Sequence, residues 1–214
     1  MSLLRGSGPR TRALRAALRR RERADVLGRA RVDARVLSTL AHPLAVVFTD
    51  TADFTRRVAR DGICHFLMAF DRAIRGLEPE LRRLGGRLVK VEADSLLLVF
   101  RDVGAACRGV ALVEARLAAA NRGRPADERL AFSYGIGFGP VLELEEDVFG
   151  LEVNLASKLG EDRSKPGDVL LTPSAFASLP AAERSRASRP CGTVHFCGQP
   201  MPVYALRLGR RRRG

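Results

Sequence analysis

The chain has 214 residues and a formal net charge of +13 at pH 7. That length allows one hydrophobic core of ordinary size, so we expect one main domain. The charge is concentrated at the ends: residues 1–37 hold 11 Arg against three acidic residues, and five more Arg occur from position 207 on. The part between these ends is close to neutral, which argues against a globular domain that binds nucleic acid through its own basic surface.

Neither a membrane span nor a metal-binding cysteine pattern is expected. No apolar run approaches the roughly 18 residues of a transmembrane segment, and the Arg-rich start lacks the apolar stretch of a signal peptide. We therefore expect a cytoplasmic protein without a transmembrane segment. The four cysteines have no C-x-x-C spacing, so a zinc site or a disulfide framework is unexpected and the thiols are predicted to be buried and reduced.

The two ends differ in character from the rest of the chain. Residues 1–41 form a basic segment, and its part at 10–35 has a helical composition with sparse apolar positions. We expect a solvated or dimer-supporting helix there; an anionic membrane surface or nucleic acid are the alternative partners. Residues 208–214 contain four consecutive Arg and are predicted to be a disordered tail.

A strand, a long helix and a hairpin are predicted first along the chain. The short, β-branched apolar run at 44–49 is typical of a buried strand. A helix follows, with apolar residues at steps of three and four: Ile63, Phe66, Leu67, Phe70, Ile74, Leu77, Leu81 and Leu84. Pro79 should kink or interrupt it. Residues 88–100 then predict a hairpin with Ala93 and Asp94 in the turn, and residues 103–121 a second helix.

Alternating glycines mark the next strand, at residues 130–139. Such glycines also occur in phosphate-binding loops, but those loops open a helix. Here Pro140 and residues 141–144 continue in extended style, so glycines that allow close backbone approach within a sheet are the better interpretation.

The last third of the chain predicts short elements. A helix at 150–160 should place Leu151, Leu155 and Leu159 on one face. A turn at 165–168 and strands at 169–172, 194–196 and 203–206 complete the pattern. The fold class is therefore α+β, a ferredoxin-like βαββαβ sheet with an added helix and added strands.

Two aspartates occupy positions from which they could hold a metal. Asp50 ends the first strand and Asp94 lies in the hairpin turn, so rigid sheet elements would position both carboxylates. The alternative is that Asp50 caps the following helix and that Asp94 only forms the turn.

Three segments, at 46–55, 88–94 and 147–158, resemble the motifs of class III adenylate/guanylate cyclase catalytic domains. The first contains Asp50 and the second contains Asp94. The first is similar to F-x-D followed by G-F-T, the second to K-x-x-G-D, and the third to D-x-x-G-x-x-V-N-x-A-x-R. The resemblance covers roughly residues 42–207, and three ordered motifs are more specific than one. It implies a cyclase-like catalytic domain at 42–207 with the ferredoxin-like core described above.

The resemblance implies a site that holds two Mg²⁺ or Mn²⁺ ions and a nucleoside triphosphate. Asp50 and Asp94 would bind the ions, with the backbone carbonyl of Thr51 as a third ligand. Phe54 and Thr55 would contact the substrate.

The resemblance also assigns the residues that select the base and act on the phosphates. Lys90 and Asp147 match the base-selecting pair, and a lysine donor with a carboxylate acceptor suits adenine, so ATP is the expected substrate. Lys90 could instead be an ordinary strand lysine paired with Glu92. Asn154 would orient the ribose, and Lys158 stands where the family has an arginine that stabilises the transition state.

The sequence departs from the family pattern at four positions. Asp53 and Ala93 replace motif glycines, Glu92 replaces an apolar residue and Lys158 replaces the arginine. The leading prediction is an adenylate cyclase that works as a head-to-tail homodimer. The alternatives are a degenerate cyclase-like module that binds nucleotide or a partner, and a scaffold that acts through its basic tails. A regulatory partner could act through the N-terminal helix; no specific nucleic acid is expected.

Overall fold

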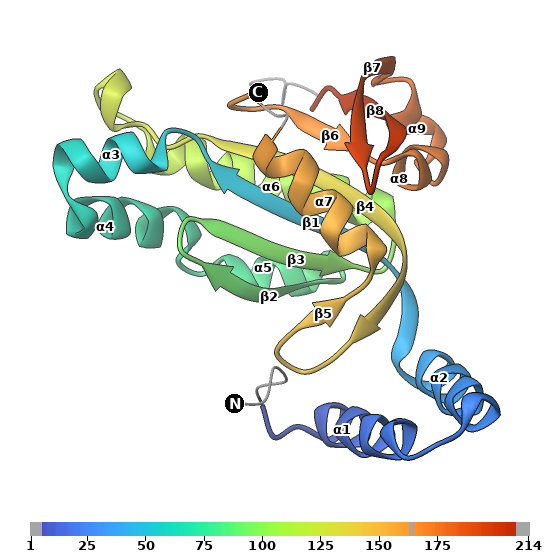
Figure 1. Cartoon of the computed structure of the whole chain (residues 1–214). Helices are drawn as coiled ribbons and strands as arrows, with labels where there is room; N and C mark the ends of the chain where they lie inside the picture. Colours follow the sequence, from blue (N-terminus) through green and yellow to red (C-terminus); the bar gives the residue numbers. More distant parts are fainter. Residues whose placement is uncertain (1–5, 163–164, 209–214) are drawn as a thin grey trace.

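The computed structural model describes residues 6–162 and 165–208 of the chain (Figure 1). The described strands form one sheet in the order β2-β3-β1-β4-β6-β8-β7, with β5 paired to β4. These strands are β1 (Ala41–Thr51), β2 (Gly86–Glu92), β3 (Ser95–Phe100), β4 (Phe132–Glu143), β5 (Val148–Phe149), β6 (Val169–Leu171), β7 (Ala187–Phe196) and β8 (Gln199–Leu206).

Two helices precede β1, and the other helices lie between strands in sequence. They are α1 (Pro9–Glu22), α2 (Val26–Leu40), α3 (Phe54–Asp61), α4 (Ile63–Ile74), α5 (Leu77–Arg83), α6 (Val103–Ala120), the short 3-10 helix η1 (Ala126–Glu128), α7 (Leu151–Asp162), α8 (Pro173–Ala177) and α9 (Ala181–Arg184). The predicted α+β class is confirmed: β1, β2, β3 and β4 lie in the spatial order 2-3-1-4 of a ferredoxin-like core, and α7 and the later strands extend it.

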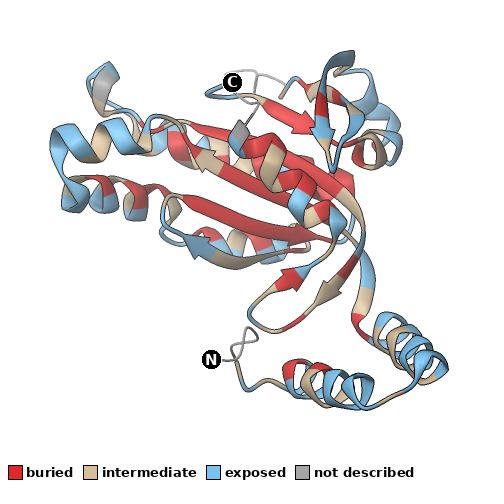
Figure 2. Cartoon of the chain, viewed as in Figure 1, coloured by how far each residue is buried: buried red, intermediate tan, exposed pale blue. Residues whose placement is uncertain are grey.

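Side chains of the central strands alternate between two apolar layers. On one face, Ala45 and Val47 of β1 pack with residues of α4, α5 and α6. On the other face, Val46 and Phe48 pack with Ala156 of α7. In Figure 1, α7 lies in front of the sheet and α6 behind it. Figure 2 shows that β3 and β6 are buried along their whole length and that β1 and β4 are buried over much of theirs. Because a strand has a period of two, the continuous apolar run of β1 serves both layers.

The glycines of β4 allow α7 to lie directly on the strand. A Cβ atom at Gly135 would lie 1.9 Å from the backbone oxygen of Ala156, and one at Gly137 would lie 2.6 Å from that of Glu152. The prediction that these glycines permit close backbone approach is therefore confirmed, and the approaching backbone is that of a helix. β4 continues in extended form to Glu143, as predicted.

The N-terminal segment forms two helices where one was predicted. α1 ends at Glu22, and Asp25 then caps α2 by accepting a hydrogen bond from the Gly28 N–H at 2.7 Å. An aspartate at this position stabilises a new helix start and so favours a break in the helical segment. The two helices pack on each other below the sheet, near β5 in Figure 1.

The long helix predicted after β1, over residues 63–84, is interrupted at Gly76 rather than at Pro79. Gly76, with a φ angle of 74°, separates α4 from α5, and Gly62, with a φ angle of 82°, separates α4 from α3, a helix that was not predicted. Pro79 lies in the first turn of α5, where its missing N–H would have no intrahelical partner. Of the predicted apolar stripe, Ile63 and Leu67 are about half exposed.

Of the three leucines predicted to share one face of α7, Leu155 and Leu159 are buried and Leu151 is exposed. The buried positions of α7 include Glu152, Leu155 and Leu159, at steps of three and four. The burial expected of the cysteines was mostly wrong. The four cysteines are free, as predicted, but only Cys107 among them is buried. The predicted disordered tail at 208–214 lies, apart from Leu208, outside the described residues.

None of the helices in the described ranges is long and apolar enough to cross a membrane.

We expect Gly135→Ala to destabilise the protein by about 3 kcal/mol, because the new methyl group would force α7 away from β4. Urea denaturation monitored by circular dichroism measures this loss. Gly192→Ala is the matched control: Gly192 lies in β7, and a Cβ atom there would meet nothing within 4 Å. Equal stability of the two variants would contradict the proposed role of Gly135.

Candidate functional site

The site begins where β1 separates from β3. Backbone pairing between the two strands ends at Phe48 and Leu97. Beyond that point threonine hydroxyls bridge the strands: Thr49 Oγ1 accepts from the Leu96 N–H at 2.9 Å, and Thr51 Oγ1 donates to the Asp94 carbonyl at 2.6 Å. The hydroxyls satisfy backbone groups that would otherwise pair in the β-ladder, and they leave a gap between β1 and β3. Asp50 lies on the β1 side of this gap, and Asp94 lies on the β3 side.

Both aspartates line one open hollow with a volume of about 650 Å³. Its lining residues are Asp50, Thr51, Asp53, Phe54, Thr55, Arg56, Ala59 and Asp94. The structure therefore brings five of the predicted site residues together: Asp50, Asp94, Thr51, Phe54 and Thr55. Phe54 is anchored by an edge-to-face contact with Phe66, at a centroid distance of 4.8 Å.

The electrostatics of the hollow favour a cation. Burial and then repulsion by Asp94 and Glu161 raise the pKa of Asp50 to about 6. Burial also raises the pKa of Asp94, although backbone N–H groups of Asp94 and Thr51 oppose the shift. Two desolvated carboxylates that repel each other are stabilised by a bound divalent cation, and oxygen ligands suit Mg²⁺ or Mn²⁺.

The donor set contains few protein carboxylates. Among the described residues, no group of three or more His, Cys, Asp or Glu side chains has metal-binding geometry. A site with two carboxylates fits ions that keep water or substrate phosphates as further ligands. The role of the Thr51 carbonyl stays a prediction.

Two of the departures from the family motifs share a backbone conformation. Asp53 and Ala93, which replace motif glycines, have φ angles of 60° and 50°. This left-handed region suits glycine and is strained for residues with a Cβ atom. The exposed Asp53 carboxylate lies 3.8 Å from Arg56, so an arginine partly balances the negative charge that Asp53 adds to the hollow.

The side chains of Lys90, in β2, and Asp147, in the turn between β4 and β5, contact each other. Neither residue lines the hollow. Lys90 Nζ lies 3.4 Å from Asp147 and 3.2 Å from Glu92, so it contacts both of its predicted partners. Partial burial lowers the pKa of Lys90, but the contacts with Glu92 and Asp147 outweigh it and raise the pKa above its ordinary value. A β-bulge between Leu88 and Lys90 reverses the alternation of β2, so that Lys90 points toward the same loop as Arg87.

Asn154 and Lys158 lie on α7 and do not line the hollow around Asp50 as the described residues form it. Asn154 is exposed, and Lys158 is partly buried. The chain therefore does not assemble all the predicted site residues around one hollow.

Sequence reasoning missed the residue that fixes α7. The buried carboxylate of Glu152 accepts hydrogen bonds from the Phe138 N–H, Thr172 Oγ1 and Ser174 Oγ at 3.1, 2.9 and 2.6 Å. It thus ties the helix to β4 and to the end of β6. Its spacing of three and seven residues before Leu155 and Leu159 was the signal in the sequence. At the other end of α7, Ser133 Oγ donates to Gly160 O at 2.9 Å.

Comparison with known proteins agrees with this geometry. The adenylate cyclase of Streptomyces coelicolor is 32% identical over 175 residues, which cover 77% of this chain and 43% of that protein. The chain spans less than half the length of the curated relatives it matches. No family model matches the chain.

Solved structures identify the fold. The adenylate/guanylate cyclase/hydrolase from Silicibacter pomeroyi superposes with a TM-score of 0.63 at 22% identity, covering 78% of this chain and 96% of that one. The adenylyl cyclase CyaB from P. aeruginosa gives 0.62 at 20% identity, with 81% and 98% covered. The chain thus resembles class III adenylate/guanylate cyclase catalytic domains and has their fold.

We expect Ala93→Gly to stabilise the protein by about 1 kcal/mol, because glycine adopts the left-handed conformation of this turn without strain. Thermal or urea denaturation measures the gain. Ala111→Gly, at an exposed position inside α6, is a control with the opposite sign, since glycine weakens a helix interior by a similar amount. A loss of stability in Ala93→Gly would contradict the assignment of strain.

In the metal-free protein, we expect the Asp50 carboxyl group to titrate near pH 6. Because this pKa exceeds the unfolded value of about 4, ionisation of Asp50 costs folding stability; the cost is absent below about pH 4 and complete above about pH 6. Carbon-detected NMR of the carboxyl group measures the midpoint. Asp94→Asn should lower it, because one repelling charge is removed, whereas Asp53→Asn should leave it unchanged. A wild-type midpoint near 4 would refute the expectation.

Proposed function

We propose that this chain is the catalytic domain of an adenylate cyclase, which converts ATP to 3′,5′-cyclic AMP and pyrophosphate as a homodimer with two divalent cations per site. The observation that carries the proposal is the mutually repelling, partly buried pair Asp50 and Asp94 in one hollow of a cyclase-type fold. Burying two like charges lowers stability, and such arrangements are typical of functional sites.

The chain's own residues would bind and orient the nucleotide. Asp50 and Asp94 would hold the cations, which when bound lower the pKa of the ribose 3′ hydroxyl and neutralise phosphate charge. Lys90 would donate to adenine N1 and Asp147 would accept from the 6-amino group. Their 3.4 Å contact already orients both side chains toward one point. Guanine has the opposite donor and acceptor at these atoms, so the pair favours ATP.

The second half of the site would come from a partner copy. Lys90, Asp147, Asn154 and Lys158 do not line the hollow with Asp50, so in the proposed site a partner copy would supply these four residues. Phe149 and Leu151 flank this part of α7 and are 40% and 59% exposed. A dimer that places α7 over its partner's hollow would bury this apolar area. Lys158 would then place its positive charge near the phosphates.

A nucleotide-binding module without turnover is the second candidate function. Asp53 favours it, because a carboxylate in the lining of the hollow repels a triphosphate. The nearby Arg56 and the exposure of Asp53 weaken this repulsion. The module would bind ATP with a metal ion and gain thermal stability but would form no cyclic nucleotide.

We expect the purified chain with Mn²⁺ to convert ATP to cyclic AMP, with GTP, CTP and UTP used less well. Chromatographic separation of the products measures this. Asp50→Asn and Lys158→Ala should each lower kcat by about a hundredfold or more, because each removes charge stabilisation in the transition state. A rise in melting temperature with ATP and Mn²⁺ but no product from any nucleotide would refute the cyclase and support the binding module.

The composite dimer predicts rescue by mixing. In an equimolar mixture of Asp50→Asn and Lys158→Ala chains that exchange freely, half of the dimers are mixed and half of their sites are intact, so about a quarter of wild-type activity should return. A mixture of Asp50→Asn and Asp94→Asn is the control. Both changes lie in the same half of the site, so no intact site forms. Rescue in neither mixture would argue against the shared site.

A further inference from the structure

The N-terminus of α1 is capped by a residue from a distant part of the chain. The Glu145 carboxylate accepts from the Arg10 N–H at 2.6 Å, the Thr11 N–H at 3.1 Å and Thr11 Oγ1 at 2.8 Å. These backbone N–H groups belong to the first turn and have no partner within the helix. Desolvation opposes the charge of Glu145, but these hydrogen bonds outweigh it and lower the pKa of Glu145 to about 2. The contact is therefore fully charged at neutral pH.

Apolar and ionic contacts reinforce this attachment. Leu14 of α1 is buried in a small cluster with Leu40 and Leu144, the residue before Glu145. Arg10 also forms a 2.8 Å ion pair with Glu143 at the end of β4. We refer to the contacts of Arg10 and Thr11 with Glu143 and Glu145 as the α1 clamp.

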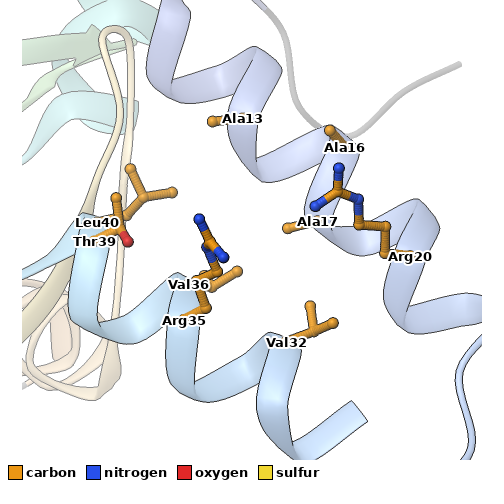
Figure 3. Close-up of a pocket in the computed structure, with 9 residues that line it drawn as sticks. All are labelled: Ala13, Ala16, Ala17, Arg20, Val32, Arg35, Val36, Thr39 and Leu40. Atoms are coloured by element: carbon orange, nitrogen blue, oxygen red, sulfur yellow. The ribbon is translucent and has the colours of Figure 1, made fainter. Parts of the chain in front are cut away.

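The remainder of α1 lies against α2. Only Thr11 and Leu14 of this helix are buried. A groove of about 260 Å³ separates α1 from α2, and its α1 wall is formed by the small residues Ala13, Ala16 and Ala17 and by Arg20 (Figure 3). An ion pair between Arg21 and Asp33 at 2.6 Å also joins α1 to α2. The α1 clamp and Leu14 connect α1 to the end of β4 and to the turn that follows it.

The clamped loop is also the loop that carries Asp147. The Leu144 N–H donates to the Asp147 carbonyl at 2.9 Å and closes the turn between β4 and β5. Arg87 of β2 holds the same turn by donating to the carbonyls of Glu145 and Leu144 at 3.1 and 3.3 Å. Arg87 also pairs with Glu143 at 3.0 Å, so Glu143 joins Arg87 to Arg10.

The chain of contacts ends at the base-selecting pair. The Asp147 side chain accepts from the Val148 N–H at 2.8 Å and lies 3.4 Å from Lys90. Only one residue, Glu146, lies between Glu145, which α1 holds, and Asp147, which faces Lys90. A shift of α1 would therefore displace the turn and with it the Asp147 carboxylate.

We propose that the α1 clamp positions the nucleotide-selecting pair: Thr11 and Glu145 hold the β4–β5 turn so that Asp147 faces Lys90, and any partner that moves α1 alters the preference for ATP over GTP. The inference rests on the proposed function, because it assigns regulation to the same site. Thr11 and Glu145 are positioning residues, which act through Asp147 and need not touch the nucleotide.

The test compares Thr11→Val with Thr11→Ser in the full-length chain. Valine has the shape of threonine but lacks the hydroxyl donor, whereas serine keeps it. The probes are 3′-deoxy-ATP and 3′-deoxy-GTP with Mn²⁺, which lack the attacking hydroxyl and report binding without turnover. We expect Thr11→Val to reduce the ratio of ATP-analogue to GTP-analogue affinity by about three- to tenfold, and Thr11→Ser to keep it near wild type. Hydrogen exchange of the Leu144 and Val148 amides should quicken in Thr11→Val but not in Thr11→Ser.

Charge-removing variants supply the second comparison. Glu145→Gln should change the affinity ratio and the amide exchange as Thr11→Val does, whereas Glu146→Gln removes the same charge from the next, exposed residue and should change neither. An unchanged ratio in both Thr11→Val and Glu145→Gln, with the wild-type chain binding the ATP analogue, overturns this inference and leaves the cyclase proposal intact. A wild-type chain that binds neither analogue overturns the proposed function and this inference with it.

Discussion

The separation of β1 from β3 is the constraint on which the candidate site depends. The two strands pair through their backbones up to Phe48 and then through the hydroxyls of Thr49 and Thr51. A regular ladder would bring Asp50 and the hairpin turn into ordinary strand contact and leave no space between them. The threonines satisfy the backbone groups and keep the space open, so two carboxylates can face one hollow. The raised pKa of Asp50 is the electrostatic cost of this arrangement.

The packing of α7 on β4 decides which residues face a partner. Gly135 and Gly137 let the helix backbone touch the strand, and Glu152 fixes its rotation through three buried hydrogen bonds. With Glu152 and Leu155 turned inward, Asn154 is turned outward to solvent. The last turn of α7 brings Glu161 close enough to Asp50 to affect its pKa. α7 therefore turns Asn154 toward solvent and, through Glu161, adds a negative charge near Asp50.

Asp53 and Ala93, which replace motif glycines, keep the backbone conformation that glycine would adopt at these two positions. Asp53 and Ala93 keep the left-handed backbone for which glycine is best suited, at the expense of strain. The turn geometry around the hollow is thus maintained although the side chains differ. What changes is the charge: Asp53 adds a carboxylate near Arg56, and this charge is the main physical difference that a bound triphosphate would meet.

The sequence by itself determined the order of the main core elements, β1, the helix at 63–84, β2, β3, α6, β4, α7, β6, β7 and β8, but not α3, β5, α8 and α9. It also determined the strand character of the glycine-rich segment and the positions of Asp50 and Asp94 at element ends. These features follow from local periodicity and turn chemistry, which neighbouring residues alone control. Only the tertiary structure decided that Gly76 rather than Pro79 divides the predicted helix, that Glu152 rather than Leu151 is buried, and that a bulge turns Lys90 toward the loop of Asp147. It also decided that Glu145 caps a helix 134 residues away. Such contacts depend on side-chain fit and satisfied hydrogen bonds between distant segments, and no local pattern encodes which segments meet.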